Sequence, residues 1–348
     1  MKKRIFSAIN YIFFLLIGVL FLWLVFRKVD LHQVMKEILE ANYFYILLAI
    51  IAAIISHIFR AARWNLMIGS MGYPTRLSTT FYAVMIGYLA NTAVPRLGEI
   101  SRCGALTNKD KIPFNSLFGT VIAERVFDMI ILLLIILGVI LFQLSLVGQF
   151  VHDNIIAPLF SNVERNYLNI ILFSIIAAAV VFLIIFLIRR MRHHFEKWPF
   201  LVKMKKFAQG LVEGIKTIKR LPQKWTFLFY TFIIWLMYAF MVYFPFFAMN
   251  GTEGLNFGDA VTIMAIGSLG IVAPVPGGIG TYHFITTALL FELYGIDKAV
   301  AASFATLTHA AQTINIIILG AVSFLLILMQ KRRMTDGNPE LYQIKNSR

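Results

Sequence analysis

Residues 260–291 read AVTIMAIGSLGIVAPVPGGIGTYHFITTALLF, a run of 32 residues without Asp, Glu, Lys or Arg. The run is apolar enough to enter a bilayer, but Pro274-Val275-Pro276-Gly277-Gly278-Ile279-Gly280 interrupts it, and Pro and Gly at this density end a helix. The flanking pieces of 14 and 11 residues are each about 21 Å long or less, short of the ~30 Å hydrocarbon core. The sequence therefore predicts a re-entrant pair of helices, which enters and leaves the membrane on the same side.

The whole chain has the composition of a membrane protein. Of its 348 residues, 59% are hydrophobic and 14% are charged, whereas a soluble domain carries roughly 25% charged residues. This composition excludes an ordinary soluble enzyme and a disordered protein, and the single cysteine, Cys103, excludes a disulfide scaffold. Uncharged runs near the ~20 residues of a spanning helix lie at 5–26, 43–59, 77–95, 129–150, 168–188, 226–249 and 299–330. We expect an all-α polytopic membrane domain over residues 1–330.

The distribution of basic residues sets the orientation of these runs. The chain has 32 Lys and Arg against 17 Asp and Glu, a net charge of +15, and the excess lies beside apolar runs. A positive-inside topology explains this pattern better than nucleic-acid binding. Segment 189–224 carries 11 Lys and Arg and is assigned to the cytoplasm, whereas segments 151–167 and 250–259 carry more acids than bases and are assigned outside. Both termini, with the tail 331–348, are then cytoplasmic in the cell (inner) membrane.

Counting the crossings identifies a second segment that turns back. The run near 117–147 must start inside and end outside, so residues 78–94 enter from the cytoplasm and return to it. A unit made of a spanning helix, a re-entrant segment and a second spanning helix then occurs at 43–147. The same unit occurs again, with opposite orientation, at 226–330. We therefore expect about six transmembrane helices and two re-entrant segments in an inverted repeat, an arrangement common in secondary transporters.

A basic amphipathic helix is predicted between the two units, within segment 189–224. Apolar residues recur there at three- and four-residue steps. The other face carries Lys203, Lys205, Lys206, Lys216, Lys219 and Arg220. Such a helix lies on anionic headgroups at the membrane surface. We interpret it as a membrane-surface linker, with a regulatory or lipid-sensing role as the alternative.

The first polar cluster lies at the tip of the first re-entrant segment and contains Asn91, Pro95, Arg96, Gly98, Glu99 and Arg102. Pro95 stops the incoming helix, and Gly98 allows a tight return. Glu99 is expected to pair with Arg96 or Arg102, which leaves one guanidinium to bind a phosphate through its fork of donors. The alternative is a set of ordinary loop charges at the cytoplasmic interface.

The second cluster, Glu124-Arg125-Val126-Phe127-Asp128, lies on a helix that runs into the bilayer. Arg125 and Asp128 are three residues apart and can pair on one face, which Glu124 shares with Asp128. A charge near the centre of a spanning helix costs ~2.5–3.5 kcal/mol, so these charges need partners or a watery cavity. The alternative is that the span starts near residue 129 and that these charges form its cytoplasmic end.

The third cluster is the break in the second re-entrant segment, with Pro274, Pro276, Gly277, Gly278, Gly280 and the nearby His283. Its bare backbone amides, at the start of the helix expected from Thr281, are predicted to receive a phosphate oxygen. The alternative is a purely structural turn.

Two spans also carry polar stripes at three-residue steps: His309, Gln312 and Asn315 in the last span, and His57, Arg60 and Arg63 in the second. We take His309 as a candidate headgroup or proton contact. The alternative for both stripes is a set of interhelical hydrogen bonds that hold the bundle.

Four motifs together resemble one family: Arg60-x-x-Arg63-Trp64, Asn91-x-x-x-Pro95-Arg96-x-Gly98-Glu99-x-x-Arg102, Glu124-Arg125-x-x-Asp128 and Pro274-x-Pro276-Gly277-Gly278-x-Gly280. This pattern is similar to the lysylphosphatidylglycerol synthase transmembrane-region family, over roughly residues 40–330. The resemblance implies a flippase-like fold with re-entrant helices that moves anionic or aminoacylated lipid. It departs from the full synthase because the chain ends soon after Gln330, so no aminoacyl-transferase domain is expected. It departs again at His309, where many relatives carry Arg, which weakens the headgroup assignment there.

These observations favour a flippase-like lipid transporter whose partners are membrane lipids with an anionic or lipid-linked headgroup. No motif of a metal site, a catalytic nucleophile or a phosphatidyl transferase is present in the sequence. We therefore expect no metal, no cofactor and no enzymatic activity. One alternative is a non-transporting subunit that recruits a soluble partner through segment 189–224. The other alternative is a membrane enzyme with Glu99 or Glu124 as its catalytic base. A homo-oligomer is also possible with this sequence.

Overall fold

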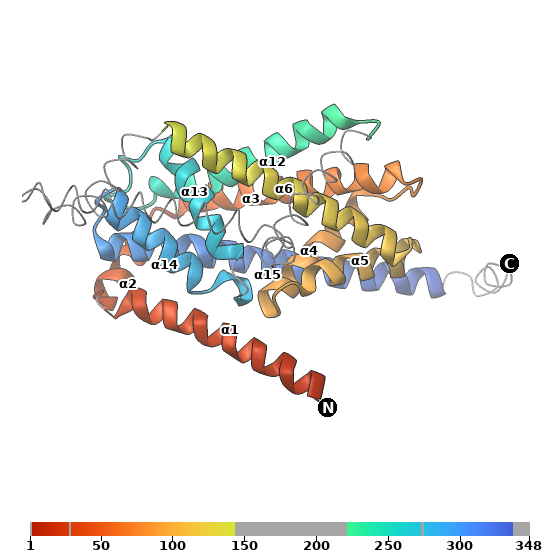
Figure 1. Cartoon of the computed structure of the whole chain (residues 1–348), viewed down its shortest axis with the longest axis horizontal. Coiled ribbons are helices and arrows are strands. Elements are labelled where there is room, and N and C mark those ends of the chain that lie inside the picture. Colours follow the sequence, from red (N-terminus) through yellow and green to blue (C-terminus); the bar gives the residue numbers. More distant parts are fainter. Residues whose placement is uncertain (1, 28, 143–220, 273–274, 337–348) are drawn as a thin grey trace, which may run out of the picture. The chain divides into compact units, whose positions relative to one another are not determined.

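The structure is a computed structural model that describes the chain except residues 1, 28, 143–220, 273–274 and 337–348, and every regular element in the described part is helical (Figure 1). The helices are α1 Lys2–Phe26, α2 Leu31–Glu40, α3 Tyr43–Ser70, α4 Leu77–Ala93, α5 Leu97–Asp110, α6 Phe114–Phe142, α12 Lys224–Phe246, α13 Phe257–Val272, the 3-10 turn η2 Pro276–Gly278, α14 Thr281–Ala288, the π-helical turn η3 Leu289–Leu293 and α15 Lys298–Asp336. This architecture confirms the predicted all-α class.

Four described helices are long and apolar enough to cross a membrane: α3, α6, α12 and α15. Helices α1 and α2 meet at a bend of 90° and make a fifth candidate if the pair is counted as one span. The predicted span at 168–188 and the basic segment up to residue 220 lie outside the described residues. The chain is therefore a polytopic membrane protein, as the composition predicts.

The chain divides into two compact units, Met1–Arg125 with Lys219–Arg348, and Val126–Ile218. The described part of the second unit is the apolar C-terminal portion of α6, which ends at Phe142. The first unit contains both predicted re-entrant segments and the start of α6, up to Arg125.

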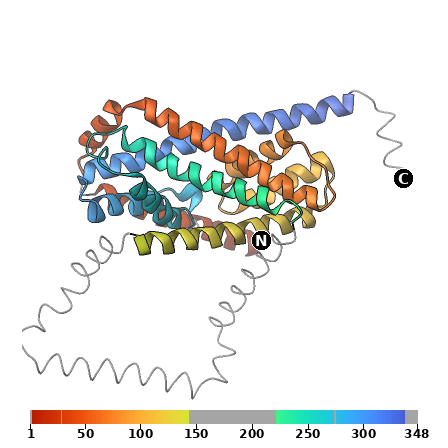
Figure 2. The ribbon, with the colours of Figure 1, turned by 90° about the horizontal axis from the view of Figure 1, so that it is seen from above.

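Helices α3 and α12 pack side by side and run in opposite directions (Figure 2). The amide of Asn42 donates to the carbonyl of Ala248 over 2.8 Å, whereas Arg63, further along α3, donates to Thr231 near the start of α12. Residue numbers thus rise along one helix as they fall along the other. Because each helix opens one predicted unit, this antiparallel packing supports the inverted repeat.

The first re-entrant segment is a helical hairpin. Helix α4 has 17 residues, about 26 Å at ~1.5 Å per residue, and so falls short of the membrane core. Helix α5 returns along it so closely that a Cβ on Gly87 would lie 2.9 Å from the carbonyl oxygen of Gly98. Asn91 closes the turn, because its Oδ1 accepts a 2.7 Å hydrogen bond from the Gly98 amide. The structure thus agrees with the predicted hairpin.

The second re-entrant segment is also a hairpin, formed by α13 and α14. Its arms are tied by the Thr281 hydroxyl, which donates to the carbonyl of Gly270 over 2.6 Å. Its tip meets the tip of the first hairpin, since a Cβ on Gly277 would lie 3.9 Å from the backbone of Thr92. Helix α1 crosses the same tip, where a Cβ on Gly18 would lie 2.8 Å from the Ile279 carbonyl oxygen. The two helix breaks are therefore neighbours inside the first unit.

Candidate functional site

The carboxylate of Glu124, on α6, lies at the centre of a buried charge cluster. Its side chain has 0% exposure, and three arginine side chains reach it. Oε1 lies 3.0 Å from Nε of Arg60 and 3.2 Å from Nη2 of Arg63, both on α3. Oε2 lies 3.0 Å from Nη1 of Arg102, on α5. We call these four residues the arginine cluster.

Helix α12 supplies neutral partners for the two arginines of α3. Arg60 and Arg63 are three residues apart and therefore share the face that packs on α12. Nη1 of Arg60 donates to the Tyr238 hydroxyl over 2.8 Å, and Nη1 of Arg63 donates to the Thr231 hydroxyl over 3.1 Å. These bonds hold both guanidinium groups in place across the interface between the two predicted units.

Arg102 is held differently and keeps one edge of its guanidinium uncommitted. Its Cζ lies 4.7 Å from the ring centre of Trp64, whose indole N–H donates to the Thr120 hydroxyl over 2.8 Å. Its Nη1 faces Glu124. Its Nε and Nη2 are buried and make no hydrogen bond with any described residue. Those two atoms form the side-on fork that binds carboxylate or phosphate through two parallel hydrogen bonds.

The arginine cluster has more basic than acidic members. Three guanidinium groups surround one carboxylate, and all four side chains are at most 6% exposed. A neighbouring pair, Arg125 and Glu99, is neutral by itself, with Nη2 2.8 Å from Oε1. Buried ions are costly unless they are compensated. Among its three arginines, Arg102 has the fork of unused donors that can bind an additional anionic group.

The pairing of the first polar cluster differs from the prediction. Glu99 was expected to bind Arg96 or Arg102, but it binds Arg125, while Arg102 turns to Glu124. Arg96 has left-handed backbone geometry, with φ of 66°, at the N-cap of α5, and its side chain is exposed. The predicted phosphate site that joins Arg96 to the other arginines is therefore not assembled in this conformation.

Glu124 lies in the interior of a helix, whereas the alternative that the membrane span itself starts near residue 129 stays a prediction. Helix α6 begins at Phe114, so Glu124 lies well inside it and is fully buried. The predicted partner of Arg125, Asp128, belongs to the unit that begins at Val126 and is described apart from the arginine cluster. The ion pair that the structure gives Arg125 is the one with Glu99.

Three of the backbone amides at the second tip are already used within the turn. The amide of Gly278 donates to Val275 O over 3.1 Å, and that of Ile279 to Pro276 O over 3.2 Å. The amide of Gly280 donates to Nδ1 of His283 over 3.3 Å. These three amides are therefore not bare, because the 3-10 turn and His283 satisfy them, whereas a phosphate contact at the Gly277 amide or at the start of α14 stays a prediction. Pro274 lies outside the described residues.

The glycines of this tip are required by its backbone. Gly277, Gly278 and Gly280 have φ of 59°, 73° and 88°, values that L side chains rarely adopt. His309, on α15, binds the tip, since its Nε2 lies 2.9 Å from the Gly277 carbonyl oxygen and must donate to it. Its ring centre lies 4.8 Å from that of His283. In this conformation His309 therefore makes a hydrogen bond between segments, as the alternative interpretation of its polar stripe predicts.

The sequence interpretation left several members of the arginine cluster out of the site. Arg60 and Arg63 were seen as a stripe, but their neutral partners Tyr238 and Thr231 were not identified. One signal in the sequence could have placed Arg60 and Arg63 in the site. Two arginines on an apolar helix are costly in a membrane, so they require a buried acid on another element. Among the described residues, no group of His, Cys, Asp or Glu is arranged to hold a metal ion.

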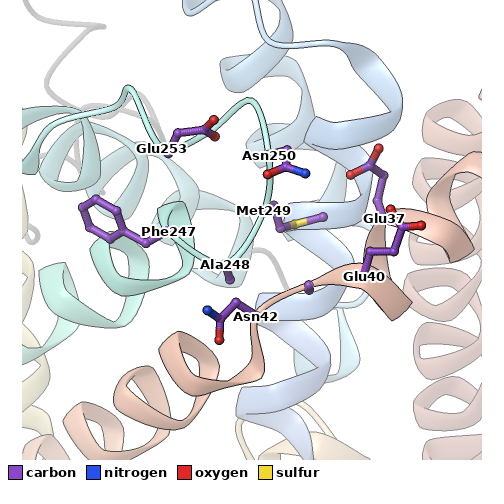
Figure 3. Close-up of a pocket in the computed structure, with 9 residues that line it drawn as sticks. Glu37, Glu40, Asn42, Phe247, Ala248, Met249, Asn250 and Glu253 are labelled. Carbon is purple, nitrogen blue, oxygen red and sulfur yellow. The ribbon is translucent and has the colours of Figure 1, made fainter.

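A separate pocket of about 270 Å³ has the opposite charge (Figure 3). It lies where the end of α2 and the start of α3 meet the loop after α12, and it is lined by Glu37, Glu40 and Glu253 with Asn42 and Asn250. Its carboxylates come from α2 and from the predicted outer segment 250–259. This pocket is thus acidic, in contrast to the arginine cluster.

Comparison with known proteins identifies relatives of the chain. The sequence model of the family described as the lysylphosphatidylglycerol synthase TM region matches residues 11–320. A UPF0104 membrane protein of Methanocaldococcus jannaschii is 25% identical over 335 aligned residues, which cover 90% of this chain and 94% of that protein. A UPF0104 membrane protein of Pyrococcus horikoshii is 24% identical over 317 residues, covering 83% and 89%. No solved structure matches the chain with significance.

Proposed function

The chain belongs to the family of lysylphosphatidylglycerol synthase transmembrane regions, and on that premise we propose that it binds an anionic or aminoacylated lipid by its phosphate and moves it across the cell membrane. The observation that carries this proposal is the buried fork of Arg102, whose Nε and Nη2 make no hydrogen bond with any described residue while Nη1 faces Glu124 in the arginine cluster. A phosphate that enters the cluster can accept two parallel hydrogen bonds from that fork.

Arg102 is the residue that we expect to touch the lipid. Its Nε and Nη2 form an uncommitted fork, while Nη1 and the Trp64 ring hold the guanidinium plane in place. Because both atoms are buried, the fork is closed to a ligand in this conformation. The phosphate would enter when one of the hairpins moves. The junction of the two tips at Thr92 and Gly277 is the natural place for that movement, because broken helices meet at the substrate site in many transporters.

The lipid would cross the membrane chemically unchanged, and the chain would have no enzymatic role. Acyl chains would stay in the bilayer while the headgroup passes along the hairpins. The chain would lie in the cell membrane with both termini in the cytoplasm, and its partners would be membrane lipids.

The test is transport of fluorescent anionic lipid in proteoliposomes that contain wild type, Arg102→Lys or Lys36→Gln. Lysine keeps the positive charge beside Glu124 but lacks the planar fork, so we expect transport to fall about tenfold, as for loss of one charged hydrogen bond. Lys36 is exposed on α2, and its replacement should leave transport unchanged.

Two outcomes would contradict the proposal. One is full transport by Arg102→Lys at normal expression. The other is a chemically altered lipid recovered from the wild-type vesicles, which would favour a membrane enzyme. If the Arg102 variant works normally while neutralising Lys203, Lys205 and Lys206 abolishes function in cells, the partner-recruiting alternative gains instead.

A further inference from the structure

A second cavity lies at the base of the first hairpin, away from the arginine cluster. It measures about 520 Å³ and opens where the start of α4 and the end of α5 come together beside Gln330 of α15. Arg76 and Lys109 are its two basic lining residues. By the predicted topology, this base lies on the cytoplasmic side of the membrane.

The start of α4 is a helix end with unusual electrostatics. Its N-cap residue is Arg76, and no side chain caps the helix. The amides of Leu77, Ser78 and Thr79 have no helical acceptor, since the first bond of the helix runs from Thr80 N to Arg76 O. A helix N-terminus already carries partial positive charge, and a basic N-cap adds to it. This end therefore favours an anion.

A buried hydroxyl points to the same conclusion independently. Thr79 is only 4% exposed, lines the cavity, and makes no side-chain hydrogen bond with any described residue. Its neighbour Thr80, by contrast, donates to Asn65 Oδ1 over 3.0 Å. A hydroxyl on the wall of a cavity that has no protein partner can donate to an oxygen ligand in the cavity.

The remaining charged groups of the cavity agree with an anionic ligand. Arg76 and Lys109 make no ion pair with any described residue. The one acidic lining residue, Asp110, is engaged at Oδ2, which accepts a 2.5 Å hydrogen bond from the Thr75 hydroxyl. The cavity thus offers two cations, backbone amides and a free hydroxyl against one occupied carboxylate.

We propose that this cavity binds a phosphate monoester at the cytoplasmic surface, either as the headgroup of a membrane lipid or as a soluble phosphorylated compound. The ligand oxygens would accept hydrogen bonds from the first amides of α4 and from the Thr79 hydroxyl. Arg76 and Lys109 would supply the compensating charge. The site is independent of the proposed transport site, because it shares no residue with the arginine cluster.

Binding to the purified full chain in detergent tests this site with two probes, dihexanoyl phosphatidic acid and glycerol 3-phosphate, and with glycerol as the blank. The variants are Arg76→Gln/Lys109→Gln, Thr79→Val, and the matched control Lys111→Gln, which removes an exposed charge two residues from Lys109 and outside the cavity lining. Arg102→Lys is measured beside them, so that a failure of the transport site is distinguished from a failure of this one.

We expect the double variant to bind at least about tenfold more weakly, because two charge-assisted contacts are lost. Thr79→Val, which keeps the side-chain shape, should bind about threefold to tenfold more weakly. Lys111→Gln and Arg102→Lys should bind normally at this site. Binding of both probes identifies the phosphate group alone as the ligand, whereas binding of phosphatidic acid only identifies a lipid headgroup. The proposal is overturned if neither probe binds better than glycerol, if the double variant binds as wild type does, or if Lys111→Gln loses as much.

Discussion

Glu124 is a buried carboxylate that contacts three arginine side chains, which come from two helices, and it has no exposure to solvent. The ion pairs of Glu124 add little net stability by themselves, but removing the carboxylate would take this partner away from buried guanidinium groups. Unpaired buried guanidinium groups are far more costly than the pairs themselves are favourable.

We predict that Glu124→Gln lowers the free energy of unfolding by about 3–5 kcal/mol, the typical cost of breaking a buried ion pair. Thermal unfolding in detergent measures the change. Glu37→Gln is the control, since Glu37 is only partly buried and has no ion-pair partner among the described residues. An unfolding midpoint equal to that of the control would show that the cluster carries no such strain.

The sequence predicted that Glu124 needs partners but not which ones. Glu99 and Arg102 are three residues apart on one helix, so the local rule favoured their pairing. Packing decided otherwise, because Arg102 faces the interior beside Trp64 and Glu124, whereas Glu99 meets Arg125. Ion pairs between residues distant in sequence depend on how helices dock, and helix periodicity does not contain that information.

At the scale of elements, the two helical hairpins were predictable and their hydrogen bonds were not. Apolar runs interrupted by Pro and Gly identified both breaks, and charge parity predicted that 78–94 turns back. The amides of Gly278, Ile279 and Gly280 are not bare, for a physical reason. A tight turn of glycines satisfies its own backbone, here with help from His283.

The close contact of α4 with α5 gives a matched pair of glycine substitutions. A Cβ on Gly98 would collide with the Gly87 carbonyl and lie 2.6 Å from the Asn91 side chain, whereas a Cβ on Gly104, on the same helix, meets nothing within 4 Å. Gly98→Ala should therefore destabilise the hairpin and lower the unfolding midpoint. Gly104→Ala should raise stability by up to ~1 kcal/mol through helix propensity. Equal effects of the two substitutions would contradict the packing of this hairpin.

At the scale of the whole molecule, the inverted repeat predicts that the two hairpins open on opposite sides of the membrane. The ends of the first hairpin, near Arg76 and Lys111, would face the cytoplasm. Those of the second, near Glu253 and Glu292, would face outside. The all-α polytopic class followed from hydropathy, because the bilayer restricts a chain to few solutions, whereas the sidedness of the hairpins stays a prediction.

We predict that single cysteines at Glu253 and Glu292 react with a membrane-impermeant maleimide on intact cells, whereas cysteines at Arg76 and Lys111 react only in inverted vesicles. The native thiol, Cys103, is buried and should give little background. Labelling of the two ends of either hairpin from opposite sides would show that the segment crosses the membrane, and the inverted repeat would then be wrong.

The crossing of α1 over the second hairpin has a consequence for biosynthesis. Gly18 and Gly280 meet backbone to backbone, yet about 260 residues separate them. At ~5–20 residues per second, the ribosome delivers the second partner tens of seconds after the first. During that interval α1 is in the membrane without its final neighbour. Its docking is therefore a late event that closes the molecule only when nearly the whole chain has been made.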